Sequence, residues 1–558
     1  MIIGLDVGGT HTDVVALSAG APMGKVKVPT DASDLYTTVF TGLKQMLAQI
    51  DPSQVKRVVL STTLTTNAVV QNKVPPVGMI VSAGPGLPPE WFRTGHHYYP
   101  VSGSVDHRGR AMTGVNEAEI RQAAATMKAE GIQHVGVVGK FSSRNPAHEI
   151  KIAEWLKPDF QNVFMGHQVS GNLNFPRRIA TTWLNASVHA LHTDFFKAVA
   201  ASLNTLGLSV PIHILKADGG TMGLDASLAY PAQTILSGPA ASVMGALAFA
   251  PATGDVVVLD IGGTTTDMAI LIDGVPVLEP LGIEISGNQT LIRALRTVSV
   301  GIGGDSAVRW DGGNLTIGPD RLGPAMTFGG DHPTPTDALR VRGDLAEGDL
   351  SAATAGMETL AAAMGCDLAE AADRVFSATC TAIGSHVAAM VDAINCRPVY
   401  TIHEMIEGYQ VSPESIVVLG APARLFAPGL EAACGLPAAA VPEWDVANAI
   451  GAGLARTTCE VSLFADTEYG RVVIPEADLE ETVAKNYTME DAKAQAGRLL
   501  MEKAAQSGAD DGDIDVDLLE ETSFNMVRGF RTSGKNIRVK VQVKPGLING
   551  YENLTGGH

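Results

Sequence analysis

A near-repeat of one glycine-rich segment limits most strongly how this chain can fold. Residues 5–17 read LDVGGTHTDVVAL and residues 259–271 read LDIGGTTTDMAIL, so eight of thirteen positions are identical. In each copy an apolar run ends at an aspartate, passes two glycines and returns into a second apolar run. Because paired glycines permit a tight turn whose backbone N–H groups are open to a ligand, each copy predicts a β-hairpin suited to phosphate. We expect two related halves that close on one ligand.

Length and charge narrow the class of protein. At 558 residues the chain is too long for a single core, and two or three domains are expected. The formal net charge of −19 repels phosphate backbones and anionic membranes, so we expect no nucleic-acid and no membrane partner. Five cysteines without a CxxC pair, no signal-like leader and no uncharged run of 18 apolar residues predict a cytoplasmic protein with reduced thiols.

Short apolar runs alternate with helical patterns along the chain. Residues 116–130 begin behind an asparagine cap, and apolar residues three and four positions apart predict long helices after Pro176 and across residues 383–394. Strands buried on both faces are predicted for the apolar runs at residues 1–5, 57–60, 77–81, 135–138 and 256–259. This order favours an α/β fold with parallel or mixed sheets and helical crossovers.

Three domains are predicted from these patterns. Residues 1–175 carry the first glycine turn, and residues 176–459 carry the second. Residues 460–558 are expected to form a small appended α+β module. Within it, residues 536–544 alternate polar and apolar, which predicts a half-exposed strand.

The repeated Asp-x-Gly-Gly-Thr segment resembles the two phosphate loops of the actin, sugar kinase and Hsp70 superfamily. That resemblance implies two actin-like (ribonuclease H-like) ATPase domains around a cleft that holds one ATP. A third element of the same plan binds adenosine. It is matched here by residues 417–423, VVLGAPA, and residues 445–456, DVANAIGAGLAR.

Further motifs over roughly residues 1–456 resemble the hydantoinase A and 5-oxoprolinase family, which contains ATP-dependent cyclic-amide hydrolases and carboxylase relatives. They occur in the family's order, at residues 7–13, 62–73, 143–149, 177–188, 218–220, 236–246, 260–267 and 333–338. The chain departs from the family's usual pattern at three places, one of which is residues 420–423, GAPA, where the family has a four-glycine run. Leu60 and Ser61 stand where His-Gly is usual, and residues 301–306 read GIGGDS instead of GAGGGS.

The resemblance implies roles for particular residues. Asp6 and Asp260 are expected to hold Mg²⁺ or its water shell, whereas Asp13 and Asp267 either act near the reacting group or stabilise the turn. The residues implied to contact ATP are Gly8, Gly9, Thr10, Thr12, Gly262, Gly263, Thr264, Thr265, Gly420, Ala421, Asn448 and Gly451. The residues implied to contact substrate are Thr62, Thr63, Asn67, Asp218 and Gly219. A purely structural role, in a turn or at the capped start of a helix, explains these residues nearly as well.

The implied reaction is the ATP-dependent hydrolysis of a cyclic amide such as a hydantoin, 5-oxoproline or another lactam. Transfer of the γ-phosphoryl group to the amide oxygen gives an imidate phosphate that water can open, which requires mainly positioning and charge neutralisation. The resemblance also implies a B-type partner subunit and a homo- or hetero-oligomer. The alternatives are a ketone carboxylase subunit, a small-molecule kinase of the same superfamily and a nucleotide-driven activator, whose iron–sulfur version the scattered cysteines disfavour.

Overall fold

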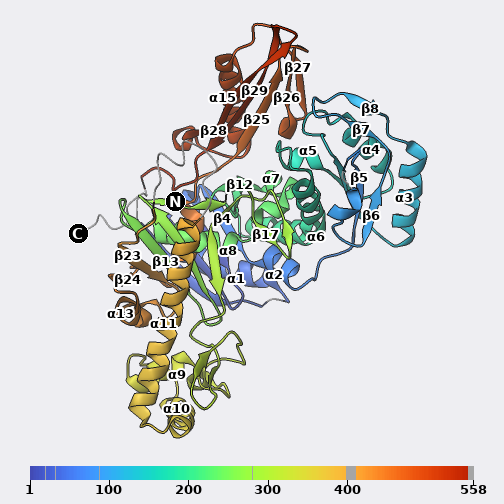
Figure 1. The fold of residues 1–558 in the computed structure, drawn as a ribbon. Coiled ribbons are helices and arrows are strands. Elements are labelled where there is room, and N and C mark those ends of the chain that lie inside the picture. Colours follow the sequence, from blue (N-terminus) through green and yellow to red (C-terminus); the bar gives the residue numbers. More distant parts are fainter. Residues whose placement is uncertain (19–20, 32, 87, 280, 397–409, 551–558) are drawn as a thin grey trace.

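The protein is described by a computed structural model that covers residues 1–18, 21–31, 33–86, 88–279, 281–396 and 410–550 (Figure 1). Two six-stranded sheets form its centre, and each contains one copy of the repeated segment. Around them lie a four-stranded parallel sheet, a projecting group of helices and a five-stranded antiparallel sheet. The α/β fold class predicted from the sequence is confirmed.

The first central sheet has the strand order β12-β11-β4-β1-β2-β3. Strands β1 and β2 form an antiparallel hairpin that pairs Asp6 with Asp13, and β4 and β11 continue the sheet in parallel with β1. Strands β11 and β12 lie beyond residue 176, so residues of the second predicted domain complete the sheet of the first. The domain boundaries given above stay predictions. The bounds are β1 Ile2–Val7, β2 His11–Ser18, β3 Ala21–Pro29, β4 Arg57–Thr62, β11 Ile212–Leu215 and β12 Thr221–Gly223.

The second central sheet repeats this plan. Its path is β15-β14-β13-β23-β24, with β20 paired to β14. Strands β13 and β14 form the hairpin that pairs Asp260 with Asp267, and β23 lies parallel to β13 as β4 lies parallel to β1. The two copies of the segment therefore occupy the same position in two related sheets. The bounds are β13 Asp255–Ile261, β14 Thr266–Ile272, β15 Val275–Pro276, β20 Thr297–Val300, β23 Ser415–Leu419 and β24 Ala438–Ala440.

Helices cover both faces of the first sheet, which explains why β1 and β4 are buried along their whole length. One face packs against helices α1 and α6, and the other packs against α8 and α14. Helices α8 and α14 also contact Val256 and Val258 of the second sheet, so they fill the space between the two halves. The bounds are α1 Leu35–Leu47, α6 Phe175–Thr205, α8 Ser237–Leu247 and α14 Ala447–Leu454.

Glycines allow α14 to come unusually close to its neighbours. A Cβ on Gly451 would lie 2.2 Å from the backbone nitrogen of Gly245 in α8, and a Cβ on Gly4 of β1 would lie 2.0 Å from the carbonyl oxygen of Ala449. Real Cβ atoms do not approach other atoms so closely, because overlap at these distances is strongly repulsive. The short α14 is thereby held between β1 and α8, beside the ends of the strands that carry the aspartates.

The peripheral parts agree with the sequence patterns. The predicted helices are present as α3 Glu117–Ala129, capped by Asn116, and as α6 and α11. Helices α9 Pro335–Arg342, α10 Leu350–Met364 and α11 Leu368–Asn395 form the projecting group. The four-stranded sheet contains β5 Val77–Ser82, β6 His97–Pro100, β9 His134–Gly139 and β10 Asn162–Met165. Among the described residues, no helix has the length and apolar character needed to cross a membrane.

The C-terminal module is an antiparallel sheet with the order β27-β26-β25-β29-β28, covered by helix α15. The predicted half-exposed strand is confirmed, since Ile537, Val539 and Val541 of β29 are buried and alternate with more exposed residues. The module's bounds are β25 Glu460–Asp466, β26 Arg471–Ile474, β27 Leu479–Thr482, α15 Met489–Gln506, β28 Val516–Arg528 and β29 Arg531–Val543.

We predict that Gly451→Ala destabilises the protein by about 2 kcal/mol or more, because the added methyl group overlaps α8 and must push the helices apart. Gly497→Ala is the matched control. Gly497 lies in α15 with open space around the position of a Cβ, and the same substitution there should stabilise by about 0.5–1 kcal/mol. Urea unfolding of both variants tests this, and an equal effect at the two positions would contradict the proposed crossing.

Candidate functional site

The two glycine turns have the same local structure. The backbone N–H of Gly8 donates to the carbonyl of His11 at 3.1 Å, and that of Gly262 donates to the carbonyl of Thr265 at 2.9 Å. Residues 9–11 are exposed and residues 262–265 are partly exposed. A Cβ on Gly9 would have no atom within 4 Å, so a ligand can approach the backbone there. Such open backbone turns are suited to binding phosphate groups.

The aspartates that end β1 and β13 meet at one side chain of α14. Asn448 donates its Nδ2 to the Oδ2 of Asp260 at 3.1 Å, and its side chain also lies beside Asp6, whose charged form it favours. Ser61, whose Oγ donates to the carbonyl of Ser237 at 3.3 Å, lies beside Asp6 and favours its charged form, and Ser242 of α8 donates to the same oxygen of Asp260. The two halves of the molecule are therefore connected through a carboxamide held between two carboxyl groups.

Burial and mutual repulsion disfavour the charged forms of these carboxyl groups. Burial, followed by the repulsion of Asp13 and Asp260, raises the pKa of Asp6 to about 7. Burial also raises the pKa of Asp267 to about 6, and it raises the pKa of Asp13 and of Asp260. One oxygen of Asp6, Oδ1, is buried without a hydrogen-bond partner among the described residues. A cation near these oxygens would favour their ionised forms.

The two hairpin aspartates Asp13 and Asp267 have different neighbours. Asp13 lies opposite Lys27 on β3, whose Nζ is 2.5 Å from its Oδ1. Asp267 lies opposite Ser299 on β20, which offers a hydrogen bond but no charge. Asp13 therefore has an ion pair, and among the described residues Asp267 has none. The two predicted roles, action near the reacting group and stabilisation of the turn, stay predictions for both.

The carboxyl groups fit the way in which proteins bind Mg²⁺ together with a nucleotide. Within the described parts of the chain, no group of three or more His, Cys, Asp or Glu side chains could hold a metal ion by itself. Magnesium, however, is commonly held by one or two carboxylates, with phosphate oxygens and water completing its shell. Asp6 and Asp260, with the unpartnered Oδ1 of Asp6, meet that requirement.

The threonines of the turns divide into two sets. The hydroxyl of Thr12 is fully buried and lies 2.9 Å from that of Thr30, and Thr266 at the same position of the second copy donates to the carbonyl of Ile302. These two hydroxyls therefore point into the protein, away from the open side of the turns. Thr10, Thr264 and Thr265 remain accessible to a ligand.

A neighbouring loop supports the second turn. The backbone N–H groups of Gly304 and Asp305 donate to the carbonyls of Gly262 and Gly263 at 2.9 and 2.7 Å. The carboxylate of Asp305 pairs with Arg321 at 2.9 Å, and Arg321 also reaches the hydroxyl of Thr264 at 3.4 Å. Arg321 is thus a cation beside the second turn that sequence reasoning missed, because it lies alone in a long loop without a motif. Ser242 was missed likewise, although it lies within the motif at residues 236–246.

The predicted adenosine residues lie in two places. Gly420 has a φ of +96°, and a Cβ on it would lie 2.7 Å from Oδ1 of Asp260, so it and the exposed Ala421 adjoin the second turn. Asn448 contacts the aspartates, and Gly451 is in the helix crossing. The latter two residues thus have structural contacts that the sequence pattern did not reveal.

The predicted substrate residues also lie in two places. Thr62, Thr63 and Asn67 lie at the end of β4 and the start of α2 Leu64–Val70, where the backbone N–H of Thr63 donates to the carbonyl of Val7 beside the first turn. Asp218 and Gly219 follow β11 at the same edge of the sheet. Asp218 lines a separate cavity of about 110 Å³ that also adjoins the C-terminal module.

The chain matches two protein-family models that together span most of its length. One is described as the hydantoinase/oxoprolinase N-terminal region and matches residues 2–159, and the other is described as hydantoinase/oxoprolinase and matches residues 178–461. The chain belongs to the hydantoinase/oxoprolinase family. The family resemblance of the sequence motifs is thereby confirmed.

Two relatives of this hydantoinase/oxoprolinase family member are the caprolactamase subunit alpha of Pseudomonas jessenii and the acetophenone carboxylase gamma subunit of Aromatoleum aromaticum. The chain is 25% identical to the first over 391 residues, covering 62% of this chain and 55% of the relative. It is 25% identical to the second over 401 residues, covering 61% and 53%. The chain spans about half the length of the curated relatives it matches.

Two solved structures share the fold. The ATP-dependent caprolactamase from Pseudomonas jessenii superimposes with a TM-score of 0.71 at 18% identity, covering 97% of this chain and 87% of that chain. Nucleotide-free acetone carboxylase superimposes with a TM-score of 0.68 at 17% identity, covering 98% and 88%. At these identities the likeness establishes the fold.

We predict that the stability of the ligand-free protein falls as the pH rises from 5 to 8. Because the pKa of Asp6 is raised from 3.8 to about 7, the folded chain holds a proton between these pH values that the unfolded chain releases. The resulting stabilisation is lost progressively as the pH rises to 7, by about 2–3 kcal/mol between pH 5 and 8. Urea unfolding at the two pH values should show a smaller fall for Asp6→Asn. The exposed carboxylate variant Glu502→Gln is the control, and an unchanged fall in Asp6→Asn would contradict the assignment.

Proposed function

We propose that this chain is the ATP-binding subunit of an ATP-dependent hydrolase of cyclic amides. One observation carries the proposal: two open glycine turns, one from each half, follow aspartates that both lie beside Asn448. This arrangement suits a ligand with several phosphate groups and a bound cation. The relation to a caprolactamase subunit supports a lactam as the substrate.

The turns would position the phosphates. Backbone N–H groups around Gly9 would contact them from one side, and those around Gly263, with the hydroxyls of Thr264 and Thr265, from the other. Arg321 lies within 3.4 Å of Thr264 and can neutralise charge that develops during transfer. Asp6 and Asp260 would hold Mg²⁺, which supplies further neutralisation when it is bound.

The substrate is proposed to reach the γ-phosphate beside the first turn. Thr62, Thr63 and Asn67 lie there, and Asn67 donates to the hydroxyl of Thr63 at 3.3 Å. An amide oxygen attacks the phosphoryl group and the bond to the ADP oxygen breaks. One water then attacks the activated carbon and the ring C–N bond breaks, which gives an amine and an acyl phosphate. A second water hydrolyses the acyl phosphate to a carboxylate and inorganic phosphate. We propose that Asp218 and Gly219, at the separate cavity, contact the substrate or its ring-opened product.

A partner subunit and location complete the proposal. Relatives named as an alpha and a gamma subunit support a B-type partner and an oligomeric assembly for this chain. Catalysis by the full assembly in the cytoplasm, with Mg²⁺ as the metal, is part of the proposal. A ketone carboxylase subunit is the second candidate, supported by the 25% identity to the acetophenone carboxylase gamma subunit and the shared fold with acetone carboxylase.

The test is phosphate release from Mg-ATP by the purified chain, with and without a panel of lactams and hydantoins. We predict that one cyclic amide stimulates release and that Asp260→Asn lowers the stimulated rate by about 100-fold or more, as expected for loss of a charge-stabilising group. Asp392→Asn, an exposed carboxylate on α11, is the control. Stimulation only by a ketone with bicarbonate would favour the carboxylase, and a stable phosphorylated product would favour a kinase.

A further inference from the structure

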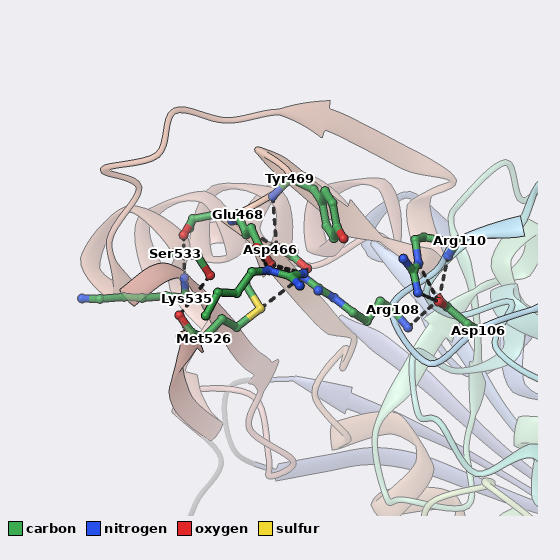
Figure 2. A network of polar contacts seen from close by, with 11 residues as sticks. Asp106, Arg108, Arg110, Asp466, Glu468, Tyr469, Met526, Ser533 and Lys535 are labelled. Atoms are coloured by element: carbon green, nitrogen blue, oxygen red, sulfur yellow. Dashed lines mark hydrogen bonds and ion pairs between the residues drawn. The ribbon is translucent and has the colours of Figure 1, made fainter. Parts of the chain in front are cut away.

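The C-terminal module is joined to the rest of the chain by several ion pairs. Figure 2 shows Arg108, whose guanidinium group reaches the carboxylates of Asp466 at 3.0 Å and Glu468 at 2.6 Å. Elsewhere in this contact, Arg293 pairs with Glu460 at 3.1 Å. At both of these places the charged side chains have partners across the contact.

A cavity of about 110 Å³ lies between the module and the first central sheet. Its wall includes Lys216 and Asp218 after β11, Arg293, and Glu460 and Lys503 of the module. Two ion pairs on this wall are complete, because Lys216 pairs with Asp218 at 3.0 Å and Arg293 pairs with Glu460. The charges that remain on the wall therefore decide what the cavity can bind.

One end of the cavity holds a cation without a carboxylate partner. Lys503 of α15 donates to the carbonyl oxygen of Glu460 at 3.1 Å, and it forms no ion pair within the described parts of the chain. Its ammonium group acts on the thiol of Cys459, another residue of the wall. Burial raises the pKa of this thiol, and the charges of Lys503 and Lys216 oppose that shift. This end of the cavity therefore has an uncompensated positive charge.

A second residue of the wall, Glu476 in the turn after β26, is an anion without a cation partner. Its Oε1 accepts the backbone N–H of Gly171 at 3.0 Å, whereas its Oε2 is buried and has no hydrogen-bond partner among the described residues. Burial, followed by the charges of Asp478 and Glu476, raises the pKa of the neighbouring Tyr230 to about 12. Asp478 is paired with the buried His167, but Glu476 has no such cation among the residues described.

The two unpaired charges have opposite signs and lie at different ends of the cavity. Glu476 acts on Tyr230, whereas Lys503 acts on Cys459. A partly buried charge without a partner is unfavourable, so a ligand that carries both a cation and an anion would compensate the two charges at once. A cavity of about 150 Å³ can hold benzene, so about 110 Å³ admits a short carbon chain. The apolar side chains of the wall that such a chain can contact include Met222, Leu291 and Val543.

We propose that this cavity binds a short aliphatic amino carboxylate, with its carboxylate at Lys503 and its ammonium group at the Oε2 of Glu476. Both contacts are charge-assisted hydrogen bonds, which are stronger than neutral ones. The identity of the natural ligand rests on the proposed function, since the ring-opened product of a lactam belongs to this class. The binding itself rests on the wall of the cavity, which is separate from the glycine turns.

The experiment is a calorimetric titration of the full chain with straight-chain ω-amino acids, from glycine to 6-aminohexanoate. Mg²⁺ and a saturating non-hydrolysable ATP analogue are present so that the glycine turns are filled. We expect one saturable site for amino acids of a preferred length. The Kd should be at least about tenfold lower than those of the alkylamine and the carboxylic acid of the same chain length, because each of these lacks one charged contact.

Two variants assign the ends of the ligand. Glu476→Gln keeps an acceptor for the N–H of Gly171 but removes the charge. It should raise the Kd of the amino acid at least about tenfold and leave that of the carboxylic acid unchanged. Lys503→Gln should weaken binding of the amino acid to a similar extent and leave binding of the alkylamine unchanged. Glu358→Gln and Lys485→Gln, which change exposed residues outside the cavity wall, are the controls.

Several results would overturn this inference. They are the absence of saturable binding by every amino acid of the series, equal binding of the singly charged analogues, and equal shifts of all three kinds of probe in the two variants. The outcome is separable from that of the proposed function. Phosphate release stimulated by a lactam, with no amino acid bound, would overturn the inference and leave the hydrolase. Binding of an amino acid with the expected variant effects supports the inference even where no lactam stimulates release.

Discussion

The close crossing of α14 with β1 and α8 is the packing constraint on which the site depends. Gly4, Gly245 and Gly451 remove the side-chain atoms that would keep these elements apart. Only at this separation does Asn448 lie between the aspartates that end β1 and β13. The crossing thus converts two separate hairpins into one site with contributions from both halves.

The site holds several buried carboxyl groups with too few positive charges nearby, and a ligand with a cation can supply the missing charge. Asp6, Asp13 and Asp260 lie in a largely buried cluster in which Lys27 provides the nearby positive charge on the first half. The raised pKa values show that the chain by itself does not fully stabilise the ionised carboxylates. A phosphate ligand with its cation supplies both the missing positive charge and acceptors for the open backbone N–H groups.

The parts of the fold that sequence could predict are those with a local signal. The repeated segment predicted both hairpins, because paired glycines between apolar runs permit such a turn and it occurs twice in the same context. The strands at 57–60 and 135–138 were recognisable since apolar residues filled both faces. By contrast, the inward direction of Thr12 depends on Thr30 across the hairpin, which no local pattern encodes.

Other features depend on tertiary contacts between distant segments. Asn448 was predicted from its motif to contact adenosine, and its place beside Asp6 and its hydrogen bond to Asp260, 188 positions away, were not visible in that motif. Arg321 acquires a place in the site only because its loop folds back beside Asp305 and Thr264. Single residues of this kind carry no periodicity or spacing by which sequence reasoning could find them.

The central claim is that one nucleotide is held by both turns at once. The most direct measurement is a calorimetric titration with a non-hydrolysable ATP analogue and Mg²⁺ for the unmodified chain, Thr10→Val, Thr264→Val and the double variant. The account predicts one equivalent bound per chain, weaker binding in each single variant, and a coupling energy between the two substitutions. Two equivalents, or an effect confined to one of the two turns, would contradict it.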